Sequence, residues 1–157
     1  MKTLLVLLSL FILSACGSAQ KKVAYLKPDT PAAIEARRDM MVGRWVGEMP
    51  TVDGKFYKWL VERRTDGGFT LQAQLKEQGK IVEQNTEFGF WGVSGHVYFS
   101  MTREMMVKGK TVPLNTNTAN YYDAYEIVEL GEGRFKYQHV ETGNVYLVHR
   151  VANDYQL

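Results

Sequence analysis

The chemistry that this sequence can support begins with Cys16, the only cysteine in the chain. It follows a positive start at Lys2, an almost wholly apolar stretch over residues 3–13 and two small residues. A charged start, an apolar stretch of about 7–15 residues and small residues before the cleavage point are typical of an export signal. A nucleophilic thiol at this place can be alkylated. We therefore predict that residues 1–15 are removed and that Cys16 becomes a modified N-terminus.

The segment Leu13-Ser14-Ala15-Cys16 resembles the lipobox of bacterial lipoproteins, in which diacylglycerol is attached to the cysteine. The resemblance implies a lipid on Cys16, a flexible tether over residues 16–29 and a folded domain over residues 30–157. Gly17 after the cysteine implies sorting to the outer membrane, by resemblance to enteric bacteria, with the domain facing the periplasm. A single cysteine also excludes an internal disulfide and a cysteine-based zinc site.

Two histidines, His139 and His149, fall on neighbouring predicted strands around a turn at Gly143-Asn144. A three-residue turn would place both rings on one face with Glu141 as a third ligand, and a two-residue turn would place them on opposite faces. A zinc site needs about three convergent ligands. The sequence does not decide between the two turns, and we predict no metal site.

Sequence motifs of the main enzyme classes do not occur: there is no Gly-x-Ser-x-Gly elbow, phosphate loop, His-Glu-x-x-His or Rossmann fingerprint. Glu83 and Glu87 share a strand face, but four strand residues separate them by about 13 Å. Glycosidase pairs lie roughly 5–9.5 Å apart. We predict a domain that is not an enzyme and uses no cofactor.

The charge balance excludes another class of function. The chain has 19 basic and 17 acidic residues. Removal of residues 1–15 leaves 142 residues, enough for one domain with a single core, and a side-chain charge near +1. Because no basic excess exists, we do not predict nucleic acid as a partner.

The elements that must position these residues begin with one helix. Thr30 is a good cap, Pro31 suits the first helical position, and Gly43 stands just past the expected end. Strands follow. The segment over residues 69–76 alternates strictly between apolar and polar residues, which predicts a half-buried strand, and Asp66-Gly67-Gly68 before it indicates a tight hairpin.

Turn signals divide the chain after the helix into eight predicted strands, near 43–49, 55–64, 69–77, 80–91, 96–104, 120–130, 134–142 and 145–152. Short strands joined by tight turns predict an all-β fold, a small antiparallel up-and-down barrel that closes on itself and removes its edges. The long interruption over residues 105–119 has two open interpretations, a short extra strand or a lid over one barrel mouth.

The segment Gly43-Arg44-Trp45 resembles the first strand of lipocalin-like, or calycin, barrels, which begins with the pattern Gly-x-Trp after a helical turn. In that family the tryptophan plugs one end of the barrel and stacks against an arginine from the last strand. The resemblance implies a structural girdle made by Gly43, Trp45 and Arg150.

Aromatic residues are frequent in the predicted strands. Inward-facing members would line an apolar pocket in a hollow barrel or fill a packed one, and both interpretations stay open. Asp123 between two tyrosines could form a polar patch. Our leading hypothesis is a small hydrophobic or amphipathic ligand, and the alternative is a protein-binding module of the cell envelope, such as an assembly partner or an enzyme inhibitor. The candidate ligand-binding residues are Tyr57, Trp59, Phe90, Tyr121 and Tyr125.

Overall fold

The structure, a computed structural model, describes residues 29–157. The predicted signal peptide, the lipidation at Cys16 and all of the predicted tether except its last residue lie outside the described residues. The elements of the described part are α1 (Pro31–Met41), β1 (Gly43–Pro50), β2 (Phe56–Arg63), β3 (Gly68–Glu77), β4 (Lys80–Ser94), β5 (Val97–Val107), β6 (Lys110–Pro113), a 3-10 turn (Ala119–Tyr121), β7 (Tyr122–Leu130), β8 (Arg134–His139) and β9 (Val145–Val151). None of the helices among residues 29–157 has the length and apolar character needed to cross a bilayer.

The helix forms where its capping residues predict it. The Thr30 hydroxyl accepts a hydrogen bond from the Ala33 amide at 3.2 Å, and Pro31 occupies the first turn, where its missing N–H costs nothing. The helix ends at Met41, and Gly43 follows with a φ of 111°, a left-handed conformation that favours glycine. This confirms the predicted start and end of the helix.

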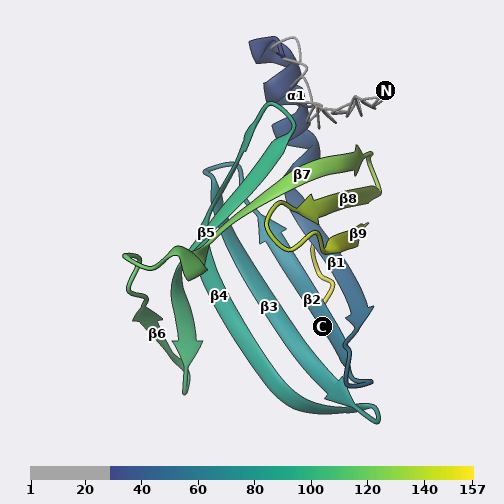
Figure 1. The fold of residues 1–157 in the computed structure, drawn as a ribbon, viewed down its shortest axis with the longest axis vertical. Coiled ribbons are helices and arrows are strands. Elements are labelled where there is room, and N and C mark those ends of the chain that lie inside the picture. Colours follow the sequence, from purple (N-terminus) through teal and green to yellow (C-terminus); the bar gives the residue numbers. More distant parts are fainter. Residues whose placement is uncertain (1–28) are drawn as a thin grey trace, which may run out of the picture.

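The helix α1 lies at one end of the barrel (Figure 1), and two arginines bind it to loops there. Arg37 donates to the carbonyl oxygen of Gly95 in the β4–β5 turn. Arg38 donates to the carbonyl oxygen of Thr65 in the β2–β3 turn at 2.5 Å. The helix therefore covers the loops at this end of the barrel.

Eight of the nine strands form a closed ring, in the order β1-β2-β3-β4-β5-β7-β8-β9 and back to β1, with every pair antiparallel. This confirms the predicted all-β up-and-down barrel of about eight strands. The remaining strand, β6, pairs with the end of β5, and the two form a hairpin that projects to one side (Figure 1). The 105–119 segment thus contains the short extra strand.

The core lies inside the barrel, where the two-residue period of each strand turns every second side chain inward. The predicted inner set of β3 includes Phe69 and Ala73, which are buried, and Trp59 on β2 pairs directly with Ala73. The largest fully buried side chains are Trp45, Arg63, Phe135, Met41 and Val148.

The C-terminal residues lie on the outer face of the barrel. Arg44 of β1 donates to the carbonyl oxygens of Asn153 and Tyr155, at 2.9 and 2.7 Å. The Lys58 ammonium stands 5.8 Å from the Tyr155 ring centroid. Leu60 faces outward on β2, yet only 2% of it is exposed.

We expect Gly89→Ala to destabilise the barrel by about 1–3 kcal/mol, because overpacking a filled site forces side chains and backbone to move. A Cβ at this position would collide with the carbonyl oxygen of Met101 and would lie 2.7 Å from Cε1 of Phe69. Gly133→Ala is the matched control, since its Cβ would meet nothing within 4 Å. Urea unfolding of the two variants measures the difference, and equal midpoints would contradict the packing described for β4 and β5.

Candidate ligand-binding site

One end of the barrel is closed by a stack of an arginine on a tryptophan. Trp45 is fully buried and its indole N–H donates to the Met41 carbonyl oxygen at 2.9 Å. The guanidinium carbon of Arg150 stands 4.3 Å from the Trp45 ring centroid. Arg150 also donates to the carbonyl oxygens of Val42 and Met40, at 2.7 and 2.5 Å. The structure therefore brings Trp45 and Arg150 together, next to Gly43, whose missing Cβ leaves space for the guanidinium.

Inside the barrel, beyond this closed end, lies a cavity of about 180 Å³. Its walls are mainly aromatic and come from β2, β3, β4, β5, β7, β8 and β9. Five tyrosines and one tryptophan face it: Tyr57, Trp59, Tyr98, Tyr125, Tyr137 and Tyr146. The barrel interior is therefore hollow on one side of a packed core.

The aromatic rings form stacked pairs that hold the walls in place. Tyr98 and Tyr125 on the neighbouring strands β5 and β7 lie with ring centroids 5.1 Å apart and planes 18° apart. Tyr137 and Tyr146 on β8 and β9 are 5.4 Å and 21° apart. Such pairs contribute about 0.5–1.5 kcal/mol beyond their buried area. The cavity is thus shaped mainly by aromatic rings.

Arg63, the last residue of β2, is the most unusual group in the wall, because only 1% of it is exposed. Its Nη2 donates to the Tyr98 hydroxyl at 3.2 Å, and its charge stands 4.7 Å from the Tyr98 ring and 5.4 Å from the Phe135 ring. Its Nε and Nη1 have no hydrogen-bond partner among residues 29–157. Within the same range, Arg63 forms no ion pair.

Two carboxyl groups also line the cavity. Glu87 on β4 accepts hydrogen bonds from the Asn85 amide at 2.8 Å and the Thr102 hydroxyl at 3.3 Å. Burial raises the pKa of Glu87 above its ordinary value, the Thr102 hydrogen bond opposes this shift, and the negative charge of Asp123 adds to it. Glu87 and Asp123 therefore share one electrostatic environment.

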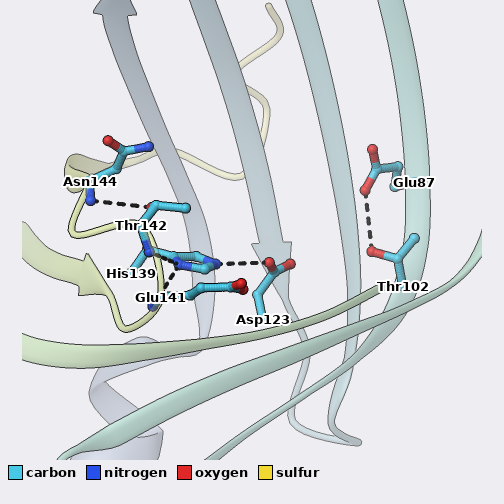
Figure 2. A network of polar contacts seen from close by, with 7 residues as sticks. All are labelled: Glu87, Thr102, Asp123, His139, Glu141, Thr142 and Asn144. Atoms are coloured by element: carbon cyan, nitrogen blue, oxygen red, sulfur yellow. Dashed lines mark hydrogen bonds and ion pairs between the residues drawn. The ribbon is translucent and has the colours of Figure 1, made fainter. Parts of the chain in front are cut away.

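Asp123 on β7 is paired with His139 on β8, as Figure 2 shows. His139 Nε2 lies 3.1 Å from the Asp123 carboxylate. His139 Nδ1 accepts the backbone N–H groups of Glu141 and Thr142, at 3.2 and 3.1 Å. Because Nδ1 is an acceptor, the ring proton is on Nε2 and is donated to Asp123. Both ring nitrogens are engaged, so His139 orients Asp123 and does not present a free base.

Three of the cavity tyrosines, Tyr57, Tyr125 and Tyr137, keep their hydroxyl protons at neutral pH. Burial raises the pKa of Tyr57 to about 12 and also raises those of Tyr125 and Tyr137 well above their ordinary values. The positive charge of Arg63 partly opposes the shift at Tyr137. The phenols therefore offer neutral hydroxyl groups, each able to donate or accept a hydrogen bond.

We expect Glu87→Gln to raise the melting temperature by a few degrees at pH 7. An acid whose pKa is raised in the folded state binds its proton more tightly there than in the unfolded chain. The wild type therefore loses stability as pH rises from the ordinary glutamate pKa through the folded value. Glutamine removes that loss, so the gain should vanish below about pH 4. Melting curves at both pH values test this, and a gain that persists in acid would contradict the assigned cause.

The predicted ligand-binding residues do not all reach the cavity. Tyr57, Trp59 and Tyr125 line it. Phe90 faces outward and is 54% exposed, because its neighbours in β4, Gly89 and Trp91, take the inward positions. Tyr121 lies in the 3-10 turn before β7 and is not among the cavity residues.

Several cavity residues were missed by the sequence reasoning, above all Arg63, Tyr98 and Tyr137. A signal for Arg63 was present, because it continues the two-residue period of Tyr57 and Trp59 and so falls on the inner face of β2. A charged residue at an inner position marks a functional candidate, since a buried charge is costly unless it is paired.

The two histidines considered for a metal lie on opposite faces. His139 faces the cavity side with Asp123, and His149 pairs with Arg134 and Val46 at outward positions. Residues 29–157 contain no group of three or more potential ligands that could hold a metal ion.

Comparisons with known proteins give likenesses at the level of structure, with four matching chains among the solved structures. A solved structure described as a lipocalin-like protein from Bacteroides uniformis is 13% identical, and the match covers 71% of this chain and 99% of that chain with a TM-score of 0.45. No protein-family model matches the sequence, and no curated protein matches it.

Proposed function

We propose that the barrel binds a small amphipathic molecule and is not an enzyme. The observation that carries the proposal is the cavity of about 180 Å³, walled by stacked aromatic rings and containing a few polar groups. Small-ligand sites are typically concave, mostly apolar and supplied with a few placed polar groups. Binding rather than catalysis is favoured because the cavity carboxylates are engaged, Asp123 by His139 and Glu87 by Thr102.

A variant that fills the cavity tests this proposal. Ser100 lines the cavity, whereas Ser94 is exposed at the end of β4. We expect 4-methylphenol to bind the full chain and Ser94→Phe in calorimetric titrations, and Ser100→Phe to bind at least 10-fold more weakly. Mass spectrometry of the full chain, purified gently from its own host, then identifies a retained molecule. Equal binding by both phenylalanine variants would place the ligand elsewhere and refute the proposal.

We further propose that lipid on Cys16 anchors the domain at the outer membrane, on the periplasmic side. The support is the lipobox-like segment of the sequence alone.

Cys16→Ser should abolish acylation, because a serine hydroxyl is not alkylated by the same chemistry. The expected product is an unprocessed or soluble form without bound lipid. Metabolic labelling with a fatty acid, followed by fractionation, measures both properties. Labelled Cys16→Ser protein in the membrane fraction would rule the anchor out.

A second candidate function, binding of an envelope protein, is favoured by one outer surface. Phe90, Phe99 and Tyr122 lie on the adjacent strands β4, β5 and β7 and are 54%, 44% and 49% exposed. Neighbouring exposed apolar side chains often mark interaction sites. A photo-crosslinker at Tyr122 should capture one partner in cells, and Phe90→Asp should abolish this product while leaving phenol binding intact. A crosslink unaffected by Phe90→Asp would refute the surface.

A further inference from the structure

We propose that the ligand is a small single-ring aromatic carboxylate whose carboxylate group pairs with Arg63. This inference rests on the proposed function, because it names the class of molecule that the same cavity would hold.

Arg63 indicates the charge of the ligand. Its guanidinium is almost completely buried, and two of its three nitrogens have no hydrogen-bond partner among residues 29–157. A buried charge is strongly unfavourable unless a counter-charge and hydrogen bonds compensate for its lost hydration. The two carboxyl groups that line the cavity are engaged elsewhere: Glu87 with Thr102, and Asp123 with His139. A ligand carboxylate would supply the missing acceptors, and a guanidinium can bind it through two parallel hydrogen bonds.

The cavity volume limits the size of the ligand. A cavity of roughly 150 Å³ lined by apolar side chains holds one benzene molecule. The cavity here, at about 180 Å³, has room for one ring with a small substituent, and not for a long acyl chain. The walls suit a ring, because four of the lining tyrosines, Tyr98, Tyr125, Tyr137 and Tyr146, form one cluster of aromatic rings in mutual contact.

The remaining polar groups orient the ligand. Arg63 lies at the closed end, against the fully buried Phe135. Asp123 is more open, with 37% of its side chain exposed, and its negative charge raises the pKa of Glu87. A carboxylate therefore points inward to Arg63, and the opposite end of the ring faces two acids. A hydrogen-bond donor at that end, such as a hydroxyl group, would strengthen binding.

The test uses the full chain at pH 7 and compares benzoate with benzamide, its neutral analogue of nearly the same shape. Loss of a charge-assisted hydrogen bond weakens binding by about 10- to 100-fold. We therefore expect the wild type to bind benzoate about 10- to 100-fold more tightly than benzamide. It should bind 4-hydroxybenzoate more tightly than benzoate. Arg63→Met should abolish the preference, because it removes the positive charge that distinguishes the carboxylate from the neutral amide.

Two controls separate the possible failures. Arg44→Met removes an arginine from the outer face of β1 and should keep the benzoate preference. Acetate should bind much more weakly than benzoate, and equal affinity would refute the aromatic class. If benzoate and benzamide bind equally, the inference is overturned and the proposed function stands. If the full chain binds neither these probes nor 4-methylphenol, both are overturned. Because the benzoate–benzamide comparison is made in the wild type, it does not depend on folding of the Arg63 variant.

Discussion

Trp45→Ala should lower the free energy of unfolding by about 3–5 kcal/mol, the usual cost of truncating a buried tryptophan to alanine. Trp45 is fully buried, its ring edge meets Phe135 at 6.0 Å between centroids, and its indole N–H bonds to Met41. Truncation also removes the surface on which the Arg150 guanidinium rests. The change therefore opens a cavity at the point where α1, β1 and β9 meet.

Trp45→Phe is the matched variant for this prediction. It keeps an aromatic ring beneath Arg150 and loses the hydrogen bond to Met41, so its cost should lie well below that of alanine. Globular domains have a free energy of unfolding of about 5–15 kcal/mol, so the alanine variant should melt far below the wild type. Thermal and urea unfolding measure both variants. An unchanged melting temperature for Trp45→Ala would mean that Trp45 does not act as the plug of the barrel.

Arg63→Met should raise the stability of the ligand-free protein by about 1–4 kcal/mol, the range seen when buried ionic groups give way to packed apolar ones. Methionine fills much of the same volume and removes two buried nitrogens that have no partner among residues 29–157. The variant loses the contacts of the guanidinium with Tyr98 and Phe135, each worth about 0.5–2 kcal/mol. We expect the recovered desolvation cost to exceed this loss.

Bound benzoate should stabilise the wild type more than Arg63→Met and so reduce the difference between the two proteins. At a benzoate concentration of 100 times its Kd, the wild type gains about 2.7 kcal/mol, and Arg63→Met gains much less. Arg44→Met is again the control and should destabilise, because Arg44 holds the C-terminal carbonyls of Asn153 and Tyr155. Urea unfolding with and without benzoate measures all three proteins. If Arg63→Met is less stable than the wild type by more than about 1 kcal/mol without ligand, the Arg63 charge is already compensated in the free protein.

Much of the local structure follows from the sequence because it depends on near neighbours. The cap at Thr30 and the conformation of Gly43 are decided by a few adjacent backbone groups. The alternation over residues 69–76 predicts an inner set with Phe69 and Ala73, and both are buried. Tight turns between short strands predict the meander and its closure into a barrel, since an open sheet would leave long edges unpaired.

The position of a strand face relative to the core was decided only by tertiary pairing. In β4, apolar residues occupy both odd-numbered and even-numbered positions. Alternation alone therefore cannot tell whether Phe90 or Trp91 faces inward. Pairing with β3 and β5 turns Gly89 and Trp91 inward and leaves Phe90 on the outside. A two-residue period defines two faces, and only the neighbouring strands decide which face is covered.

The candidate site itself depends on contacts between residues far apart in the chain. Asp123 meets His139 because β7 and β8 pair with a register shift after Ile127, and no spacing rule in the sequence predicts that contact. The alternation in β2 determines that Arg63 faces inward. Arg63 lies beside a cavity of about 180 Å³ and has no acidic partner among residues 29–157. The side chains that β3, β5 and β8 bring to the same level of the barrel decide this. Periodicity along a strand is a local property of the chain, whereas the charge left unpaired in an interior depends on every strand that surrounds it.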